Sequence, residues 1–123
     1  MYAKEINSTL SFEAFMNSLS QFIGTSRYYK YYLNTVLTDG TRYLAEQLRC
    51  FWLLDDIAIF SKSYQGHDLL VCQYDDDKKL LTISDNEQII AKNSYDYTSF
   101  SIVPTSPIEI YFCHNVLYLP SEH

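Results

Sequence analysis

Glycine is scarce in this chain, with three residues in 123. Loops that cradle phosphate groups need several glycines close together, so the sequence excludes a P-loop and a dinucleotide-binding fingerprint. The HExxH pattern of zinc proteases and the GxSxG pattern of serine hydrolases do not occur either. The sequence therefore favours a protein without enzymatic activity over an enzyme.

Cysteine is also sparse, and its arrangement excludes two common roles. Cys50, Cys72 and Cys113 are an odd number of widely spaced residues, and no CxxC or CxH spacing occurs. A disulfide framework and a structural zinc site both need closer patterns than this one. We expect reduced, buried thiols in a cytoplasmic protein that holds neither a metal nor a cofactor.

Long apolar runs and positive charge are both lacking. The N-terminal MYAKEINSTL has no apolar signal-peptide core, and no stretch reaches membrane-spanning length, so we expect no membrane association. The net charge of -6 argues against direct binding of duplex nucleic acid. Residues 62–123 carry four Lys or Arg and nine Asp or Glu, and this negative half favours a protein partner with a basic surface.

Apolar periodicity predicts two helices in the first half of the chain. Apolar residues three and four positions apart predict a helix over residues 12–23 and a long central helix over 41–60. The sequence TDG at 38–40 supplies the start signal of the central helix. Between the two helices we expect an irregular stretch that ends in a short strand near residues 33–37.

The second half of the chain predicts a sheet. From residue 68 onward the pattern changes to alternating apolar residues with hairpin signals, including a strand over 98–103 and a last hairpin around His114 and Asn115. No helix lies between these strands to permit parallel crossovers. We therefore predict a single α+β domain over residues 1–123, with both helices packed on one face of an antiparallel sheet of about five or six strands.

Asp55 falls on the most apolar face of the predicted central helix, close to Trp52. A buried carboxylate has to be paired or hydrogen-bonded. One interpretation is a buried polar hub that accepts hydrogen bonds from a tyrosine, the Trp52 indole or a loop backbone. The other is a pocket between helix and sheet in an enzyme or small-ligand-binding protein, lined by Asp55, Trp52, a tyrosine and His114.

Two further groups of residues suggest partner-binding surfaces. The acidic group lies in predicted hairpin turns and would contact a basic protein partner; it comprises Asp75, Asp76, Asp77, Asp85 and Glu87. The tyrosine group has the large rings and polar tips that are enriched at interfaces; it comprises Tyr28, Tyr29, Tyr31 and Tyr32. These tyrosines could equally lie across the core between helices and sheet.

Four segments carry a resemblance to a known family: TDG at 38–40, YLAE at 43–46, FWLLD at 51–55 followed by Ile57, and LPSEH at 119–123. The chain resembles a family of small bacterial proteins of unknown function that also occur on phages and plasmids. Its members show a TDG, YLAE, YWLLD and Ile series and end in LPSEY or LPSEH, so Phe51 replaces the usual tyrosine. The resemblance implies a mobile-element context and carries over no catalytic residue or cofactor.

These observations predict a small acidic interaction protein of mobile-element type. Its specific form would be an inhibitor that binds the basic nucleic-acid-binding surface of a host defence complex, as anti-CRISPR proteins do. An enzyme or small-ligand-binding protein with a pocket around Asp55 is the alternative, and a toxin–antitoxin or plasmid-maintenance component is a third. The sequence leaves the oligomeric state open.

Overall fold

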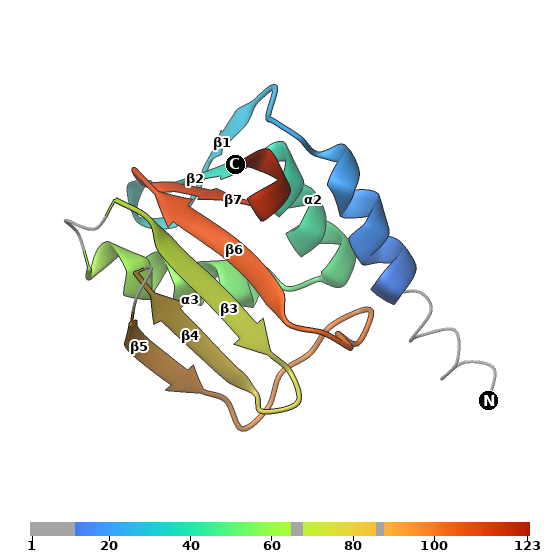
Figure 1. The fold of residues 1–123 in the computed structure, drawn as a ribbon, viewed down its shortest axis with the longest axis vertical. Helices are drawn as coiled ribbons and strands as arrows, with labels where there is room; N and C mark the ends of the chain where they lie inside the picture. Colours follow the sequence, from blue (N-terminus) through green and yellow to red (C-terminus); the bar gives the residue numbers. More distant parts are fainter. Residues whose placement is uncertain (1–11, 65–67, 86–87) are drawn as a thin grey trace.

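A computed structural model describes residues 12–64, 68–85 and 88–123 and confirms the α+β class (Figure 1). The predicted first helix, 12–23, is confirmed for residues 12–21, with its last turn in the 3-10 form. In chain order the elements are a helix over 12–18, η1 (Leu19–Gln21), β1 (Tyr28–Lys30), η2 (Tyr32–Asn34), β2 (Val36–Thr38), α2 (Asp39–Leu48), α3 (Phe51–Lys62), β3 (Leu70–Asp75), β4 (Leu80–Ser84), β5 (Ile89–Ser94), β6 (Ile108–Cys113), β7 (Val116–Tyr118) and η3 (Pro120–Glu122).

Within the described ranges, seven strands form one mixed sheet in the order β1-β2-β7-β6-β3-β4-β5. Strands β2 and β7 run parallel, with Leu37 opposite Leu117, and the other neighbouring pairs are antiparallel. The predicted antiparallel sheet of five or six strands is therefore wrong in strand number and in one pairing. The short strand expected near 33–37 is β2, and its partner lies about 80 positions later, where no local pattern could indicate the pairing.

The predicted hairpins in the second half are confirmed. Strands β3, β4 and β5 pair antiparallel in sequence order, and β6 pairs antiparallel with β7. His114 and Asn115 have φ angles of 50° and 67° in the last turn. Two consecutive positive φ angles are what a two-residue type I′ hairpin requires.

The predicted single central helix is wrong, because the chain turns at Arg49 and forms two helices. Helix α2 begins at Asp39, two residues before the predicted start, with Thr38 of the TDG signal as its N-cap. It ends at Leu48, and Arg49 then takes the left-handed conformation with φ 54°. Helix α3 starts at Phe51 in a new direction. The apolar pattern runs through the break because both helices bury their apolar faces in the same core, so periodicity did not reveal it.

The predicted strand over 98–103 is also wrong; this segment is irregular and lies against the break between the helices. The Ser101 backbone N–H donates to the Leu48 carbonyl oxygen at 2.9 Å, and the Ser101 hydroxyl donates to the Gln47 carbonyl oxygen. The last carbonyls of a helix have no partner within it. The segment satisfies these carbonyls of α2, so its backbone is not available to the sheet.

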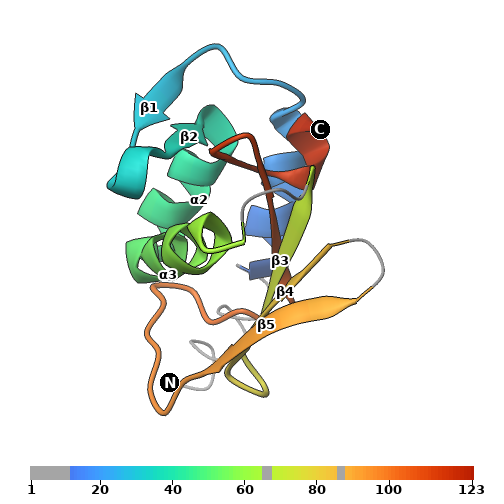
Figure 2. The ribbon, with the colours of Figure 1, turned by 90° about the vertical axis from the view of Figure 1, so that its left-hand side faces the viewer.

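The sheet has one buried face and one open face. Burial alternates along β6, where Ile108, Ile110 and Phe112 are buried and the residues between them are partly exposed. Figure 2 shows α2 and α3 on one side of β3, β4 and β5. The opposite side is the open face. Among the described residues, no helix is both long enough and apolar enough to cross a membrane.

Candidate functional site

Asp55 is half-buried on α3 and accepts a hydrogen bond from the Tyr31 hydroxyl. That hydroxyl also lies 3.2 Å from the Phe51 carbonyl oxygen. Burial, and then the hydrogen bond to Asp55, raises the pKa of Tyr31 far above its usual value, so this tyrosine stays a proton donor. A tyrosine was among the donors expected for a polar hub. Asp55 lines none of the three grooves described for this structure.

Trp52 lies at the centre of an aromatic cluster between α3 and the segment that follows β5. Its ring centroid is 5.7 Å from that of Tyr74, 5.3 Å from Tyr95 and 5.4 Å from Phe100, all edge-on. Its indole N–H donates to the Ser99 carbonyl oxygen at 3.0 Å. Trp52 thus holds the irregular segment against α3, and its N–H is used within the fold.

The four tyrosines of the predicted patch point to different sides of the chain. Tyr29 and Tyr31 are half-buried and bond to the helices: Tyr31 to Asp55, and Tyr29 to the Asp39 Oδ1 atom at 2.8 Å. Tyr28 and Tyr32 are 63% and 51% exposed. Successive side chains of an extended strand point to opposite faces, which separates Tyr28 from Tyr29.

The predicted acidic residues lie at two opposite ends of β4. Asp75 is the last residue of β3 and Asp76 and Asp77 follow it in the turn to β4, whereas Asp85 follows the last residue of β4. A five-residue strand spans about 17 Å, so these residues do not form one continuous surface. Glu87 lies outside the described residues.

Asp76 is directed into the fold. Its Oδ1 atom accepts hydrogen bonds from the Tyr74 hydroxyl at 2.8 Å and from the Thr98 hydroxyl at 3.2 Å. The Lys79 ammonium nitrogen lies 3.6 Å from the same oxygen. Asp76 therefore anchors the turn from inside. Asp77 is the exposed residue of the run, and Asp75 is half-buried.

Sequence reasoning missed a contact between the two ends of the motif series. The Glu122 carboxylate accepts hydrogen bonds from the Thr38 hydroxyl at 2.6 Å, the Leu119 backbone N–H at 2.9 Å and the Gly40 backbone N–H at 3.1 Å. Thr38 is the N-cap of α2, so a negative charge sits where the helix dipole favours one. We call this arrangement the Glu122 latch. The TDG and LPSE segments were both noted, but 78 residues lie between them and no local pattern connects them.

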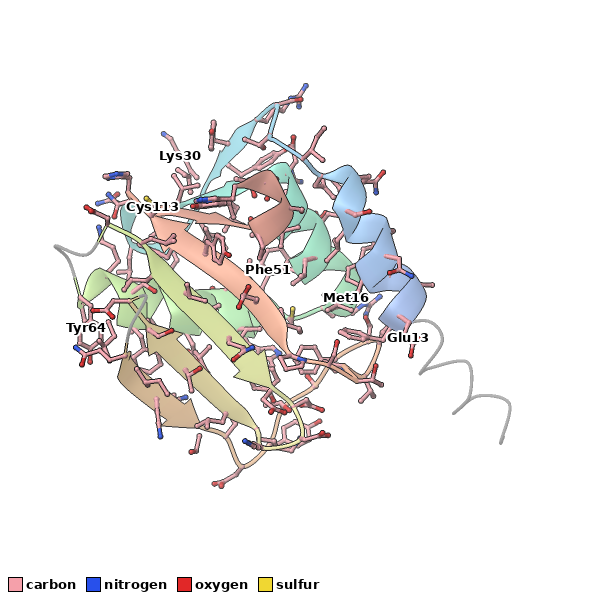
Figure 3. All side chains as sticks on the ribbon, viewed as in Figure 1. Glu13, Met16, Lys30, Phe51, Tyr64 and Cys113 are labelled. Carbon is pink, nitrogen blue, oxygen red and sulfur yellow. The ribbon has the colours of Figure 1, made fainter. Side chains whose placement is uncertain are left out.

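A groove of about 410 Å³ lies on the open face beside the Glu122 latch. Cys113, labelled in Figure 3, contributes to its wall from the end of β6. Within the described ranges, no group of three or more His, Cys, Asp or Glu side chains is arranged to hold a metal ion. The lining of the groove also includes Tyr28, Thr38, Val116, Tyr118, Glu122 and His123. We call this cavity the open-face groove.

Residues 13–123 match the model of DUF6876, a family of unknown function. The chain belongs to DUF6876. The predicted membership in a family of unknown function is confirmed. No curated protein and no solved structure matches the chain. The part of the chain that matches DUF6876 includes every residue of the Glu122 latch and of the open-face groove.

The three thiols of this DUF6876 protein differ in accessibility, and we expect one of them to react in the folded state. Cys50 and Cys72 are buried, and burial raises the pKa of each thiol to about 12. Only the thiolate is an efficient nucleophile. Burial therefore protects both residues in two ways: it blocks the reagent, and it keeps the thiol protonated. Titration with a chromogenic disulfide reagent at pH 8 should label Cys113 rapidly, and the other two only in denaturant.

A Cys113→Ser variant is the control for this titration, and its folded form should not react rapidly. Rapid labelling of all three thiols in the native wild type would contradict the burial of Cys50 and Cys72. Unfolding followed at the same time by circular dichroism shows whether slow labelling comes from the folded or the unfolded state.

Proposed function

We propose that this DUF6876 protein is a non-enzymatic interaction protein that binds a basic surface of a protein partner. The proposal is carried by one surface, which we call the acidic end: Asp75, Asp77, Asp96 and Tyr97. The Tyr95 backbone N–H donates to the Lys79 carbonyl oxygen at 2.9 Å, which places residues 96 and 97 beside the turn between β3 and β4. Tyr97 is 81% exposed.

The acidic end combines charge with an exposed aromatic ring. Tyrosine is enriched at protein interfaces because its ring contributes area and its hydroxyl a hydrogen bond. Asp77 and Asp96 are exposed residues, and Asp96 is the direct sequence neighbour of Tyr97. Surface charges of this kind steer a partner of opposite sign and raise its association rate.

The turn that carries Asp77 in the acidic end is held by hydrogen bonds. The Asp77 backbone N–H donates to the Asp75 Oδ1 atom at 3.0 Å, and Asp76 fixes the turn from inside. A surface that is already ordered loses less conformational entropy on association. This supports a recognition surface in preference to a mobile acidic turn.

The specific form that we propose is an inhibitor that occupies the nucleic-acid-binding surface of a host defence complex, in the manner of anti-CRISPR proteins. A net charge of -6 and the exposed carboxylates of Asp77 and Asp96 resemble the phosphate charge that such a surface recognises. The mobile-element resemblance of the sequence favours this class of partner. A partner of this class would release its nucleic acid when the protein binds.

The test is a charge reversal at the acidic end. The double variant Asp77→Lys/Asp96→Lys should weaken capture of a lysate partner by about 10-fold or more at 0.15 M salt, and nucleic acid should compete with the wild type for that partner. Affinity capture with quantitative mass spectrometry provides the measurement. The matched control is Asp68→Lys/Glu13→Lys, which changes the net charge equally at exposed positions away from the acidic end. Equal loss in both variants would reduce the effect to net charge and contradict the proposal.

A further inference from the structure

We propose that the open-face groove binds a small organic cation, an ammonium group carried on a compact apolar body. The proposal is separate from the acidic end. The groove is built on β1, β2, β7 and β6, which form one half of the sheet, whereas the acidic end lies at the turn between β3 and β4 in the other half. It starts from the strand register. Tyr28 lies opposite Thr38 across β1 and β2, and the pairing of Leu37 with Leu117 places Thr38 beside Tyr118.

This register makes a slot between two tyrosines. Tyr28 and Tyr118 lie on strands separated by β2, so their backbones are about 10 Å apart. The residue between them is Thr38, whose short side chain is turned toward the Glu122 latch. A small side chain between two large ones leaves the space that forms the groove, with an aromatic ring on either side.

One wall of the slot is rigid. The rings of Tyr118 and His123 stack with an interplanar angle of 4° and a centroid distance of 5.8 Å, and the Tyr118 hydroxyl lies 2.9 Å from the His123 Nδ1 atom. Tyr111 packs edge-on against both rings at 5.6 and 5.4 Å. The opposite wall, Tyr28, is 63% exposed. Aromatic faces attract cations through the negative charge above the ring.

The charge of the groove selects the sign of the ligand. Glu122 is the only Asp, Glu, Lys or Arg among the described residues that line it. Its carboxylate is held in place by three hydrogen bonds, and Glu122 lines the groove, so its negative charge can pair with a cationic ligand. An anion would meet this charge at short range, whereas a cation would be paired.

The size of the groove sets the class of cation. About 410 Å³ falls within the range of small-molecule sites, and it is far larger than a bare metal ion or an ammonium ion requires. Cys113 and Val116 add apolar wall at its edge. These features fit a compact organic cation with methyl or methylene groups around the nitrogen.

The experiment compares choline with its uncharged isostere 3,3-dimethylbutan-1-ol, using NMR titration of the full chain with labelled tyrosine and histidine. Choline should shift the signals of Tyr28, Tyr118 and His123 in a saturable way, and the isostere should not. Equal shifts with both compounds would show an apolar slot and overturn the proposal. The absence of saturable shifts with choline, or shifts confined to tyrosines outside the groove, would also overturn it.

Variants test the two contributions separately. Tyr28→Leu should weaken choline binding by about 2- to 5-fold, Tyr28→Phe should retain it, and Tyr32→Leu is the matched control at an exposed tyrosine outside the groove. Glu122→Gln should abolish saturable binding in protein that circular dichroism shows to be folded. Unchanged binding in Tyr28→Leu, together with unchanged binding in folded Glu122→Gln, would overturn the proposal.

A lysine side chain of a protein carries the same chemistry as a free amine. A short peptide with one trimethyllysine therefore forms a third arm of the titration. Binding no tighter than that of choline supports a small-molecule ligand. Peptide binding at least 10-fold tighter would overturn the small-molecule source and assign the groove to a protein side chain.

Discussion

Replacing Glu122 with alanine is expected to lower the free energy of unfolding by about 2–4 kcal/mol, since hydrogen bonds to a charged group contribute about 1.5–3 kcal/mol each and Glu122 is partly exposed. The change leaves the Thr38 hydroxyl and the backbone N–H groups of Gly40 and Leu119 without their acceptor. It also removes a negative charge from the N-terminus of α2. Urea denaturation followed by circular dichroism measures the effect.

Two variants control for the loss of a carboxylate. Glu46→Ala removes a carboxylate whose ion pair with Arg42 is exposed, and it should cost about 0.5 kcal/mol or less. Glu122→Gln keeps one acceptor oxygen and should fall between the wild type and Glu122→Ala. A loss in Glu122→Ala no larger than that in Glu46→Ala would show that the latch contributes nothing to stability.

Gly40 tests the same latch from the helix side. Alanine in a helix is normally about 1 kcal/mol better than glycine, so an unconstrained site would be stabilised. Here a Cβ atom would lie 2.6 Å from the Leu119 Cδ1 atom and 2.7 Å from the Glu122 Oε1 atom. Overpacking costs about 1–3 kcal/mol, so we expect Gly40→Ala to be destabilising. In a double-mutant cycle, Glu122→Ala should reduce that cost, because it removes one of the two clashing groups.

Replacing Trp52 with alanine is expected to lower the free energy of unfolding by about 3–5 kcal/mol, the range measured for the largest aromatic truncations. The ring is edge-on to Tyr74, Tyr95 and Phe100, and its N–H bonds the Ser99 carbonyl oxygen. Its loss should also release the irregular segment 98–103 from the end of α2. Hydrogen exchange should therefore increase at the Ser101 amide before the sheet amides.

Two further variants separate the contribution of the Trp52 ring from that of its N–H group and provide a control. Trp52→Phe keeps an aromatic ring and loses the hydrogen bond to Ser99, so it should cost less than Trp52→Ala. Phe51→Ala is the matched control on the adjacent position, where the ring is 37% exposed and its removal should cost far less. If Trp52→Ala were no more destabilising than Phe51→Ala, the aromatic cluster would not hold this segment in place.

These expectations change where a function is to be sought. In the sequence, Asp55 and Trp52 were the clearest candidates for a buried site because they lie on the most apolar predicted helix. Their contacts with Tyr31 and Ser99 give both residues a role within the fold. The acidic end and the open-face groove lie elsewhere. Both combine residues from different elements, so substitutions there can test the proposed binding without removing a core side chain.

Local sequence patterns predicted the elements that are stabilised by interactions between residues close together in the sequence. The TDG start of α2 depends on Thr38, whose side chain bonds the backbone N–H three residues later, and the last hairpin depends on the turn preference of Asn115. The break at Arg49 was missed because a single left-handed residue changes the direction of the chain without interrupting the apolar spacing. The strand expected over 98–103 was wrong because its backbone groups serve the free carbonyls of α2.

By itself, the sequence determined the α+β class, the hairpins of the second half, the negative charge and the family, since each depends on composition or on residues a few positions apart. The tertiary structure alone decided the parallel pairing of β2 with β7, the Glu122 latch and the groove between Tyr28 and Tyr118. These features join residues that lie about 80 or more positions apart. Such contacts form only because burial of the common core brings the two ends of the chain together, and that energy is shared among many residues, so no short segment encodes it.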